Sequence, residues 1–110
     1  MILGIGVDLA VVSRIEGAMK NPKFLPRIFT TAEIQEISDA ESAAGLWAAK
    51  EAVIKAVGRK IPWKHIEVLK GAYGKPVASL LFEPGFAQAR VHVSISHDGG
   101  MAMGFAVLET

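Results

Sequence analysis

The spacing of apolar and polar positions predicts a strand, then helices, then four more strands. Residues 2–11 are rich in Ile, Val and Leu, which favours a strand. Capping and stop signals predict helices over 14–20, over a short segment after Thr30, and from Asp39 or Ser42 to Gly58. Strands are then expected at 64–70, 76–82, 91–97 and 101–109, with a short helical piece at 86–90. This order indicates an α+β fold, in which a small, mostly antiparallel sheet packs on a long central helix.

Composition narrows the class of protein. The 110 residues are expected to form one domain, residues 1–110, and the 51% of apolar residues suffices for a core. A net charge of +1 gives no sign of nucleic-acid binding, and the absence of cysteine excludes disulfides, thiolate zinc sites and a cysteine nucleophile. The apolar run at 2–7 lacks a basic leader and is too short to span a bilayer. We therefore expect a cytoplasmic protein with no membrane or nucleic-acid partner.

The first strand has two unlike faces, because side chains alternate across a strand. One face carries the apolar side chains of Leu3, Ile5, Val7, Leu9 and Val11, and we expect this face to be the core side. The other face carries Gly4, Gly6 and Asp8. Either a helix packs on the glycines while Asp8 caps a turn, or a ligand approaches the backbone there beside the carboxylate.

The long helix also offers two interpretations. An apolar stripe of Ala43, Leu46, Val53 and Val57 predicts its core side, with Lys50 emerging at the edge of that stripe. Trp47, Glu51 and Lys55 share a neighbouring face, and alanines at 48, 49, 52 and 56 make the helix thin enough for close approach. Glu51 and Lys55 could form an exposed ion pair. Alternatively, Asp8 and Glu51 could hold Mg²⁺, with Lys50 and Lys55 as nearby cations for phosphate groups.

Taken together, these segments resemble the holo-acyl-carrier-protein synthases, the small 4′-phosphopantetheinyl transferases. The resemblance covers nearly the whole chain. Its first part is carried by GIGVDL at 4–9 with Arg14-Ile15, and by Phe24, Arg27, Phe29-Thr30 and Glu33. Its later motifs are WAAKEA at 47–52 with Lys55, Ala56 and Gly58, IEV at 66–68, GKP at 74–76, and VSISH at 93–97 with Ala102 in the final strand. The segments that contain Asp8 and Glu51 are specific in combination.

The resemblance implies an activity and roles for individual residues. Members of this family transfer the phosphopantetheine arm of coenzyme A to a serine of an apo acyl carrier protein and release adenosine 3′,5′-bisphosphate. Asp8 and Glu51 resemble the ligands of Mg²⁺, and Lys55 resembles the lysine that contacts the phosphates. The general base remains open between Glu51 and a water molecule. The pathway that the carrier protein serves also remains open, because fatty acid biosynthesis, polyketide synthesis and others are all compatible with the resemblance.

Further positions are implied to bind coenzyme A or the carrier. Lys50, Gly58 and His97 are expected near coenzyme A, with His97 beside its nucleotide at the start of the Asp98-Gly99-Gly100 turn. Arg14 and Arg27 are expected to dock the acidic carrier protein.

The family also implies a homotrimer with sites shared between subunits, and we expect the glycine-lined face of the first strand to form that contact. Val11, Arg59-Lys60 and Met101 depart from the family pattern. A member of the fold that binds coenzyme A or a carrier protein without catalysis is the alternative function.

Overall fold

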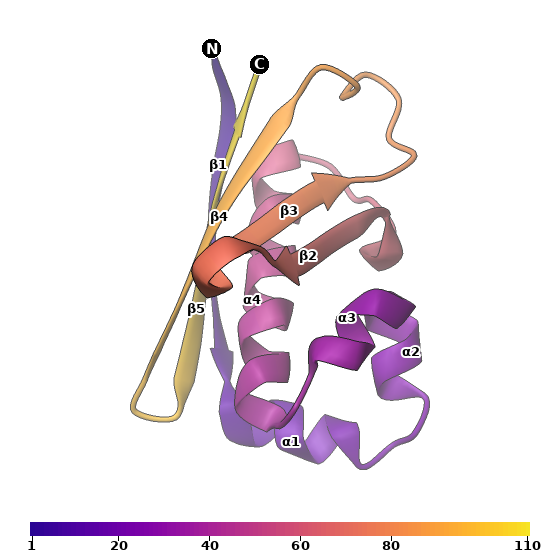
Figure 1. Ribbon diagram of the computed structural model, residues 1–110, viewed down its shortest axis with the longest axis vertical. Coiled ribbons are helices and arrows are strands. Elements are labelled where there is room, and N and C mark those ends of the chain that lie inside the picture. Colours follow the sequence, from indigo (N-terminus) through magenta and orange to yellow (C-terminus); the bar gives the residue numbers. More distant parts are fainter.

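A long helix lies along one face of a three-stranded antiparallel sheet, and the other elements pack around this pair (Figure 1). The computed structural model describes residues 1–110. The helices are α1 (Val12–Met19), α2 (Phe24–Ile28), α3 (Thr31–Glu36) and α4 (Ala40–Val57), and the strands are β1 (Ile2–Val11), β2 (Ile66–Lys70), β3 (Pro76–Leu80), β4 (Arg90–Asp98) and β5 (Met101–Glu109). The predicted α+β class is confirmed.

The main sheet has the order β1-β5-β4, which makes β1 and β4 its two edge strands. Both strand pairs are antiparallel, and β2 and β3 form a separate antiparallel pair. The two ends of the chain lie side by side (Figure 1), and the amino group of Met1 donates to the carbonyl oxygen of Thr110 over 3.0 Å.

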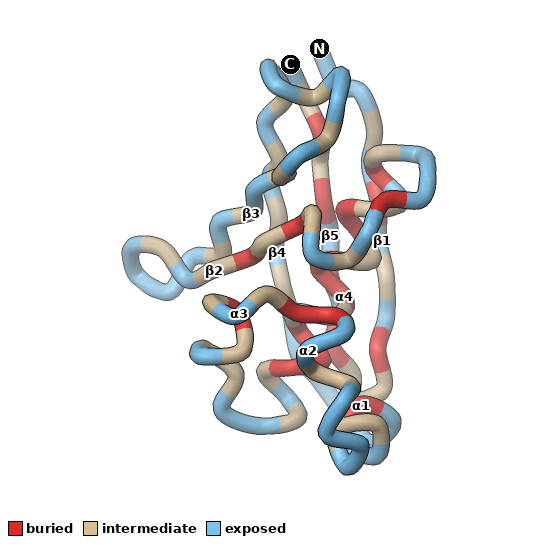
Figure 2. The backbone as a smooth tube through the Cα atoms, turned by 90° about the vertical axis from the view of Figure 1, so that its right-hand side faces the viewer, coloured by how far each residue is buried: buried red, intermediate tan, exposed pale blue.

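Glycines let α4 approach the sheet more closely than any other residue would allow. A Cβ atom added at Gly4 would lie 1.9 Å from the carbonyl oxygen of Ala56, and one at Gly6 would lie 2.0 Å from that of Ala52. Gly104 on β5 meets the backbone of Ala48 in the same way. Buried residues therefore concentrate along α4 and on the strand faces turned towards it (Figure 2). The close approach predicted from the alanines is confirmed.

The prediction that the apolar face of β1 is its core side is wrong. Ile5, Val7 and Leu9 are 64%, 49% and 61% exposed, whereas Gly6 and Ala10 on the other face are buried. The reason is the gain in packing: a glycine-lined face admits the helix backbone itself, so the larger side chains are left on the outer face.

Local signals in the sequence set the start of α3 and both ends of α4 as predicted. Thr30 and Glu33 form a capping box at the start of α3, and Asp39 and Ser42 form another at the start of α4. Gly58 ends α4 in the left-handed conformation, with φ of 85°.

Several local predictions need correction. Helix α2 was not expected as a separate element, and α1 begins at Val12 without a side-chain cap. The predicted helical piece at 86–90 does not form: residues 86–89 make an isolated turn, and Arg90 already begins β4. Strand β3 ends at Leu80, ahead of the predicted residue 82, because the positive φ of Phe82 (59°) reverses the chain.

Lys50 does not emerge at the edge of the helix, as predicted, but is fully buried. Its ammonium group lies 2.6 Å from Oε1 of Glu33, which is also fully buried. The same carboxylate accepts hydrogen bonds from the backbone nitrogens of Thr30 and Val68, at 2.8 Å each. Glu33 therefore joins α3, α4 and β2.

None of the four α-helices combines the length and the hydropathy needed to cross a bilayer.

Candidate active site

Asp8 and Lys55 meet where the edge strand β1 packs on the last turns of α4. The ammonium group of Lys55 donates to Oδ1 of Asp8 over 3.1 Å and to the carbonyl oxygen of Val7 over 2.9 Å. The alternative ion pair between Lys55 and Glu51 does not form, since the salt-bridge partner of Lys55 is Asp8. Asp8 and Lys55 line a hollow of about 340 Å³ together with Val7, Leu9 and Met103.

Glu51 belongs to the same site, as its electrostatics show. Burial raises the pKa of its carboxyl above the usual value, and the nearby negative charge of Asp8 raises it further, while Lys55 acts in the opposite direction. Two carboxylates of this kind repel each other, so a cation placed between them would relieve the repulsion. No histidine, cysteine or further acidic residue joins Asp8 and Glu51 to make a three-residue metal-binding group. This donor set suits Mg²⁺, which prefers one or two carboxylates and fills its remaining positions with water or phosphate oxygens.

Two further cations, Lys50 and Arg59, are engaged elsewhere in the fold, and of these Lys50 was expected near phosphate groups. The buried ion pair with Glu33 gives Lys50 no access to solvent, so its expected contact with coenzyme A finds no support here. Arg59 lies 3.2 Å from Glu83 and also donates to the carbonyl oxygen of Pro84. Arg59 therefore fastens the loop after α4 to residues 83–84. Gly58 sits before that loop, exposed at the end of the helix.

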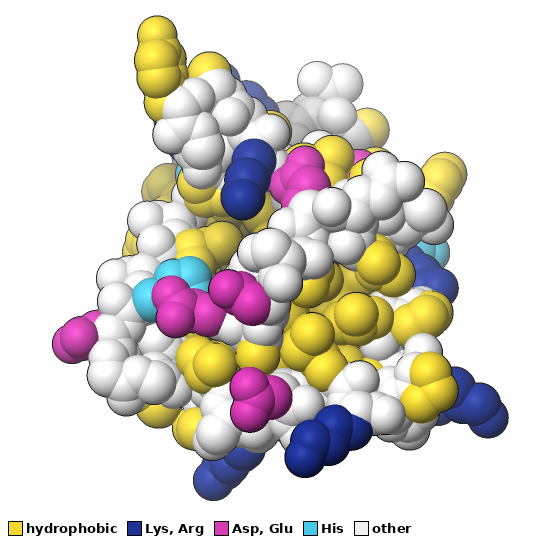
Figure 3. Space-filling model, turned by 60° about the horizontal axis from the view of Figure 1, so that its bottom comes forward, with side chains coloured by type: hydrophobic (Ala, Val, Ile, Leu, Met, Phe, Trp, Pro, Cys, Tyr) yellow, Lys and Arg dark blue, Asp and Glu magenta, His cyan; other side chains and the backbone are white.

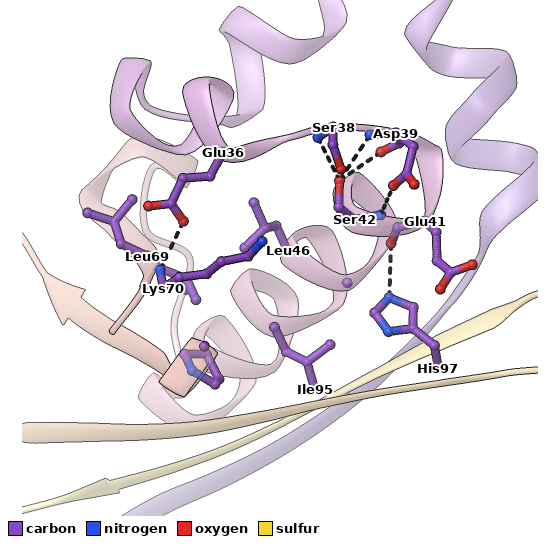
Figure 4. Close-up of a pocket in the computed structure, with 14 residues that line it drawn as sticks. Glu36, Ser38, Asp39, Glu41, Ser42, Leu46, Leu69, Lys70, Ile95 and His97 are labelled. Carbon is purple, nitrogen blue, oxygen red and sulfur yellow. Dashed lines mark hydrogen bonds between the residues drawn. The ribbon is translucent and has the colours of Figure 1, made fainter. Parts of the chain in front are cut away.

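His97 is not brought to the Asp8 cluster. It lies at the end of β4, the edge strand opposite β1, where its Nε2 donates to the carbonyl oxygen of Glu41 over 2.9 Å (Figure 4). Its ring packs against Gly45 of α4. There it lines a second hollow, of about 380 Å³, between α3, α4, β4 and the β2–β3 hairpin. Figure 3 shows a histidine against acidic side chains on one face of the molecule, with hydrophobic side chains beside them. One chain therefore carries two separate hollows, one lined by Asp8 and Lys55 and the other by His97.

Arg14 and Arg27 lie on consecutive helices, α1 and α2, at the end of the molecule where β1 runs into α1 (Figure 1). Both side chains are exposed, and neither takes part in an ion pair. They are therefore free to meet a negatively charged partner.

Sequence reasoning missed the partner of Lys50 and the exposed apolar face of the sheet. Glu33 was identified from its capping signal and from the family resemblance, and its burial as the partner of Lys50 was not predicted. On the outer face, Val7 stands opposite Phe105 and Leu9 opposite Met103. Phe105 and Met103 are 41% and 42% exposed. The alternating apolar residues in the final strand were the available signal for this second face.

The chain belongs to the 4′-phosphopantetheinyl transferase superfamily, because the family model of that description matches residues 4–106. The predicted family is therefore confirmed. Among curated relatives, the holo-[acyl-carrier-protein] synthase of an Exiguobacterium strain is 40% identical and is aligned over 99% of this chain and 93% of its own length. The holo-[acyl-carrier-protein] synthase of Clavibacter michiganensis is 41% identical and is aligned over 99% of this chain and 97% of its own length.

Solved structures agree with the family assignment. The holo-[acyl-carrier-protein] synthase of Helicobacter pylori in complex with coenzyme A superposes with a TM-score of 0.88 at 32% identity, covering 96% of this chain and 99% of that one. The Bacillus anthracis synthase, in complex with CoA (3′,5′-ADP), gives a TM-score of 0.86 at 37% identity, covering 100% and 98%. The predicted fold of small phosphopantetheinyl transferases is thereby confirmed.

Proposed function

We propose that this protein is a holo-acyl-carrier-protein synthase, which transfers 4′-phosphopantetheine from coenzyme A to a serine of an apo acyl carrier protein. The observation that carries this proposal is the pair of Asp8 and Lys55 at an open hollow, with Glu51 near enough for the charge of Asp8 to raise its pKa. Curated relatives with this activity in their names match the full chain, and two matching structures hold coenzyme A or its nucleotide.

The reaction exchanges one phosphorus–oxygen bond for another. The serine oxygen attacks the phosphorus that carries the pantetheine arm, the bond to the bridging oxygen of the diphosphate breaks, and adenosine 3′,5′-bisphosphate leaves while the serine hydroxyl loses its proton. Such transfers depend on positioning and on neutralising charge at phosphate oxygens. Lys55 supplies a positive charge at the rim of the hollow, where Asp8 and the carbonyl of Val7 hold its ammonium group.

Asp8 and Glu51 would hold Mg²⁺ in this reaction. The raised pKa of Glu51 beside Asp8 supports that assignment, because two carboxylates that disfavour each other's charge gain from a shared cation. When bound, the ion neutralises diphosphate charge and orients the group that is transferred. Lys55 would keep its positive charge beside the diphosphate oxygens while negative charge moves to the leaving group.

Arg14 and Arg27 would dock the carrier protein. Acyl carrier proteins are acidic, and two exposed, unpaired arginines on neighbouring helices would attract such a partner over a distance. Both reactants are intracellular metabolites or proteins, so the enzyme would act in the cytoplasm, with fatty acid biosynthesis as one pathway for its carrier.

The subunit contact of a homotrimer would lie on the apolar outer face of β1 and β5. The expected contact through the glycines is wrong, because α4 of the same chain covers them. The outer face instead presents exposed Ile5, Val7, Leu9, Met103 and Phe105 on adjacent strands, an apolar area that favours burial against another subunit. The hollow at Asp8 borders this face, since Val7, Leu9 and Met103 line it. A neighbouring subunit could therefore add its own His97 hollow to this site.

The test is the intact mass of an apo acyl carrier protein after incubation with the protein, coenzyme A and Mg²⁺. We expect a gain of one phosphopantetheine, lost on addition of a chelator and lost in Asp8→Asn. The Asp8→Asn variant should still bind the carrier, because Arg14 and Arg27 remain. If no carrier gains mass while coenzyme A still binds, the non-catalytic alternative is favoured and this proposal fails.

A further inference from the structure

The contact between α4 and the main sheet is built from very small residues. Three glycines of β1 and β5 touch the backbone of α4, and the α4 residues that they meet there include three alanines. A Cβ atom added at Gly104, for example, would lie 2.4 Å from the carbonyl oxygen of Ala48. Ridges of side chains that fit into grooves are what set the orientation in which a helix packs on its neighbour. A contact of glycine against alanine has hardly any ridges, so it brings α4 close to the sheet but resists rotation of the helix about its axis only weakly.

A buried ion pair holds α4 from the opposite side. Successive residues of an α-helix point about 100° apart, so Lys50 faces away from Ala48 and Ala52, which lie two positions to either side. Figure 1 and Figure 2 both show α3 on the side of α4 that is turned away from β1. There the ammonium group of Lys50 lies 2.6 Å from Oε1 of Glu33 on α3 and 5.4 Å from the ring centre of Phe29.

The carboxylate of Glu33 is itself held in place. It accepts from the backbone nitrogen of Thr30, the N-cap residue of α3, and from that of Val68 on β2, at 2.8 Å each. Both members of the ion pair are fully buried. Charge-assisted hydrogen bonds are short and strong, and rotation of α4 would pull the Lys50 ammonium group away from this fixed acceptor. The pair therefore sets the rotational position of α4.

Glu51 follows Lys50 directly, so the same anchor sets the direction of the Glu51 side chain. Helical side chains reach about 5–6 Å from the axis, and a rotation of roughly 20° would therefore move the Glu51 carboxylate by about 2 Å relative to Asp8 on β1. Mg²⁺ demands near-ideal octahedral geometry with ligand distances of about 2.0–2.1 Å. A metal site shared between α4 and β1 therefore tolerates little rotation of the helix.

We propose that Glu33 and Lys50 are positioning residues for metal binding, because their ion pair fixes the rotation of α4 that turns Glu51 towards Asp8. This inference rests on the proposed function, since it concerns the Mg²⁺ site of that reaction. Neither side chain of the pair reaches the surface, so neither touches a substrate. Metal affinity is then expected to depend on the pair itself and not on the overall stability of the chain.

The first experiment measures metal binding without any substrate. Mn²⁺ is the probe, because it accepts the same oxygen ligands as Mg²⁺ and its bound fraction is measured by electron paramagnetic resonance. We expect the wild type to bind one Mn²⁺ per chain and Lys50→Met to bind it at least ten-fold more weakly. The matched control is Val53→Ala, which opens a cavity at another fully buried position of α4 but leaves the pair intact. Its Mn²⁺ affinity should stay within three-fold of the wild-type value. Wild-type affinity in Lys50→Met, or an equal loss in both variants, overturns the inference.

A double variant separates positioning from stability, and it keeps the test decisive where Lys50→Met alone fails to fold. Glu33→Gln combined with Lys50→Met removes both charges, so no unpaired charge is left buried, and its resistance to urea should lie closer to that of the wild type. Its Mn²⁺ affinity should nevertheless stay at least ten-fold below the wild-type value, because a methionine side chain forms no hydrogen bond that fixes the helix. Recovery of the affinity to within three-fold would give the pair a purely structural role and overturn the inference.

The transfer assay on the wild type separates this inference from the proposed function. If the wild type modifies the carrier protein and binds Mn²⁺, but the variants bind Mn²⁺ equally well, only the inference fails. If the wild type transfers nothing to any carrier, the proposed function fails. An active wild type that binds no Mn²⁺ overturns the inference and leaves the transfer reaction in place.

Discussion

The ammonium group of Lys55 lies 3.1 Å from the carboxylate of Asp8, although 47 residues separate them in the chain. The second hydrogen bond of Lys55, to the carbonyl oxygen of Val7, ties α4 to the free edge of β1. This pairing keeps a cation and a carboxylate together in the lining of one hollow, and both influence the pKa of Glu51. Chemistry on a diphosphate requires both kinds of group within a few ångströms.

Replacing Lys55 by methionine should reduce kcat more than it affects substrate binding. The variant removes the cation that steadies developing charge, and losses of about 10²–10³-fold are typical for such groups. Steady-state kinetics with coenzyme A and an apo carrier measure this. Lys60→Met, at an exposed lysine beyond α4, should retain the wild-type kcat. A kcat of Lys55→Met close to that of the wild type would exclude Lys55 from the reaction.

Removal of Arg14 should act on the carrier protein alone. Arg14→Ala is expected to raise the KM for the carrier about ten-fold and to leave the KM for coenzyme A within two-fold, since one exposed charge contributes mainly to steering and docking. The effect should shrink at high salt, where charges are screened. Arg90→Ala serves as the control, because Arg90 is an exposed arginine on β4. Equal increases of both KM values would contradict a docking role.

Glu51 should make the stability of the metal-free protein depend on pH. Its folded-state pKa is raised above the ordinary value of 4.5, so between the two pKa values the folded protein binds more protons than the unfolded chain. Stability from this residue is therefore present at low pH and falls as pH rises through the raised pKa. We expect Glu51→Gln to raise Tm at about pH 7.5 and to lose this advantage near pH 3.5, where the carboxyl is protonated in both states.

Thermal unfolding in the presence of a chelator measures this effect, since bound Mg²⁺ would mask it. Glu16→Gln, at an exposed glutamate on α1, should leave the difference in Tm between the two pH values as it is in the wild type. A Glu51→Gln variant with a lower Tm at neutral pH would contradict the raised pKa. The same variant should have no detectable transferase activity.

A charge on the outer face of β1 should dissociate the subunits. Val7→Lys places an ammonium group among Leu9, Met103 and Phe105, and burying an unpaired charge in such a contact is costly. Light scattering should then give the mass of one chain, while the wild type gives that of a trimer. Val77→Lys is a close control, because Val77 on β3 is 53% exposed, similar to the 49% of Val7. A wild-type protein that is a monomer at micromolar concentration would refute the trimer.

The buried pair of Glu33 and Lys50 should be important for stability. Lys50→Met leaves the Glu33 carboxylate buried without its cation, and breaking a buried pair in this way costs roughly 3–5 kcal/mol. Glu33→Leu should cost at least as much, since it also removes the acceptor for two backbone nitrogens. Urea unfolding measures both variants, and Lys20→Met, at an exposed lysine, should change the free energy of unfolding by less than about 0.5 kcal/mol. A Lys50→Met variant as stable as this control would show that the pair contributes little.

Local physics made much of the fold readable from the chain. The capping boxes at Thr30 and Asp39 and the left-handed glycine at position 58 involve only neighbouring residues, so their effect does not depend on the rest of the molecule. The hairpin turn at Asp98-Gly99-Gly100 is local in the same sense. The sequence also predicted Asp8, Glu51 and Lys55 as one catalytic group, through a family resemblance. The comparisons confirm the family, and the structure brings Asp8 and Lys55 into contact.

Tertiary structure alone decided which face of β1 is buried and what surrounds Lys50 and His97. The alternation of residues 2–11 defines two faces but not the partner of either, and the close fit of α4 to Gly4 and Gly6 settled the choice. Lys50 is buried because Glu33, on another helix, compensates its charge. His97 ends on the strand edge opposite Asp8 because β5 pairs between β1 and β4. Each of these outcomes depends on contacts between segments far apart in the chain, which no local pattern of residues encodes.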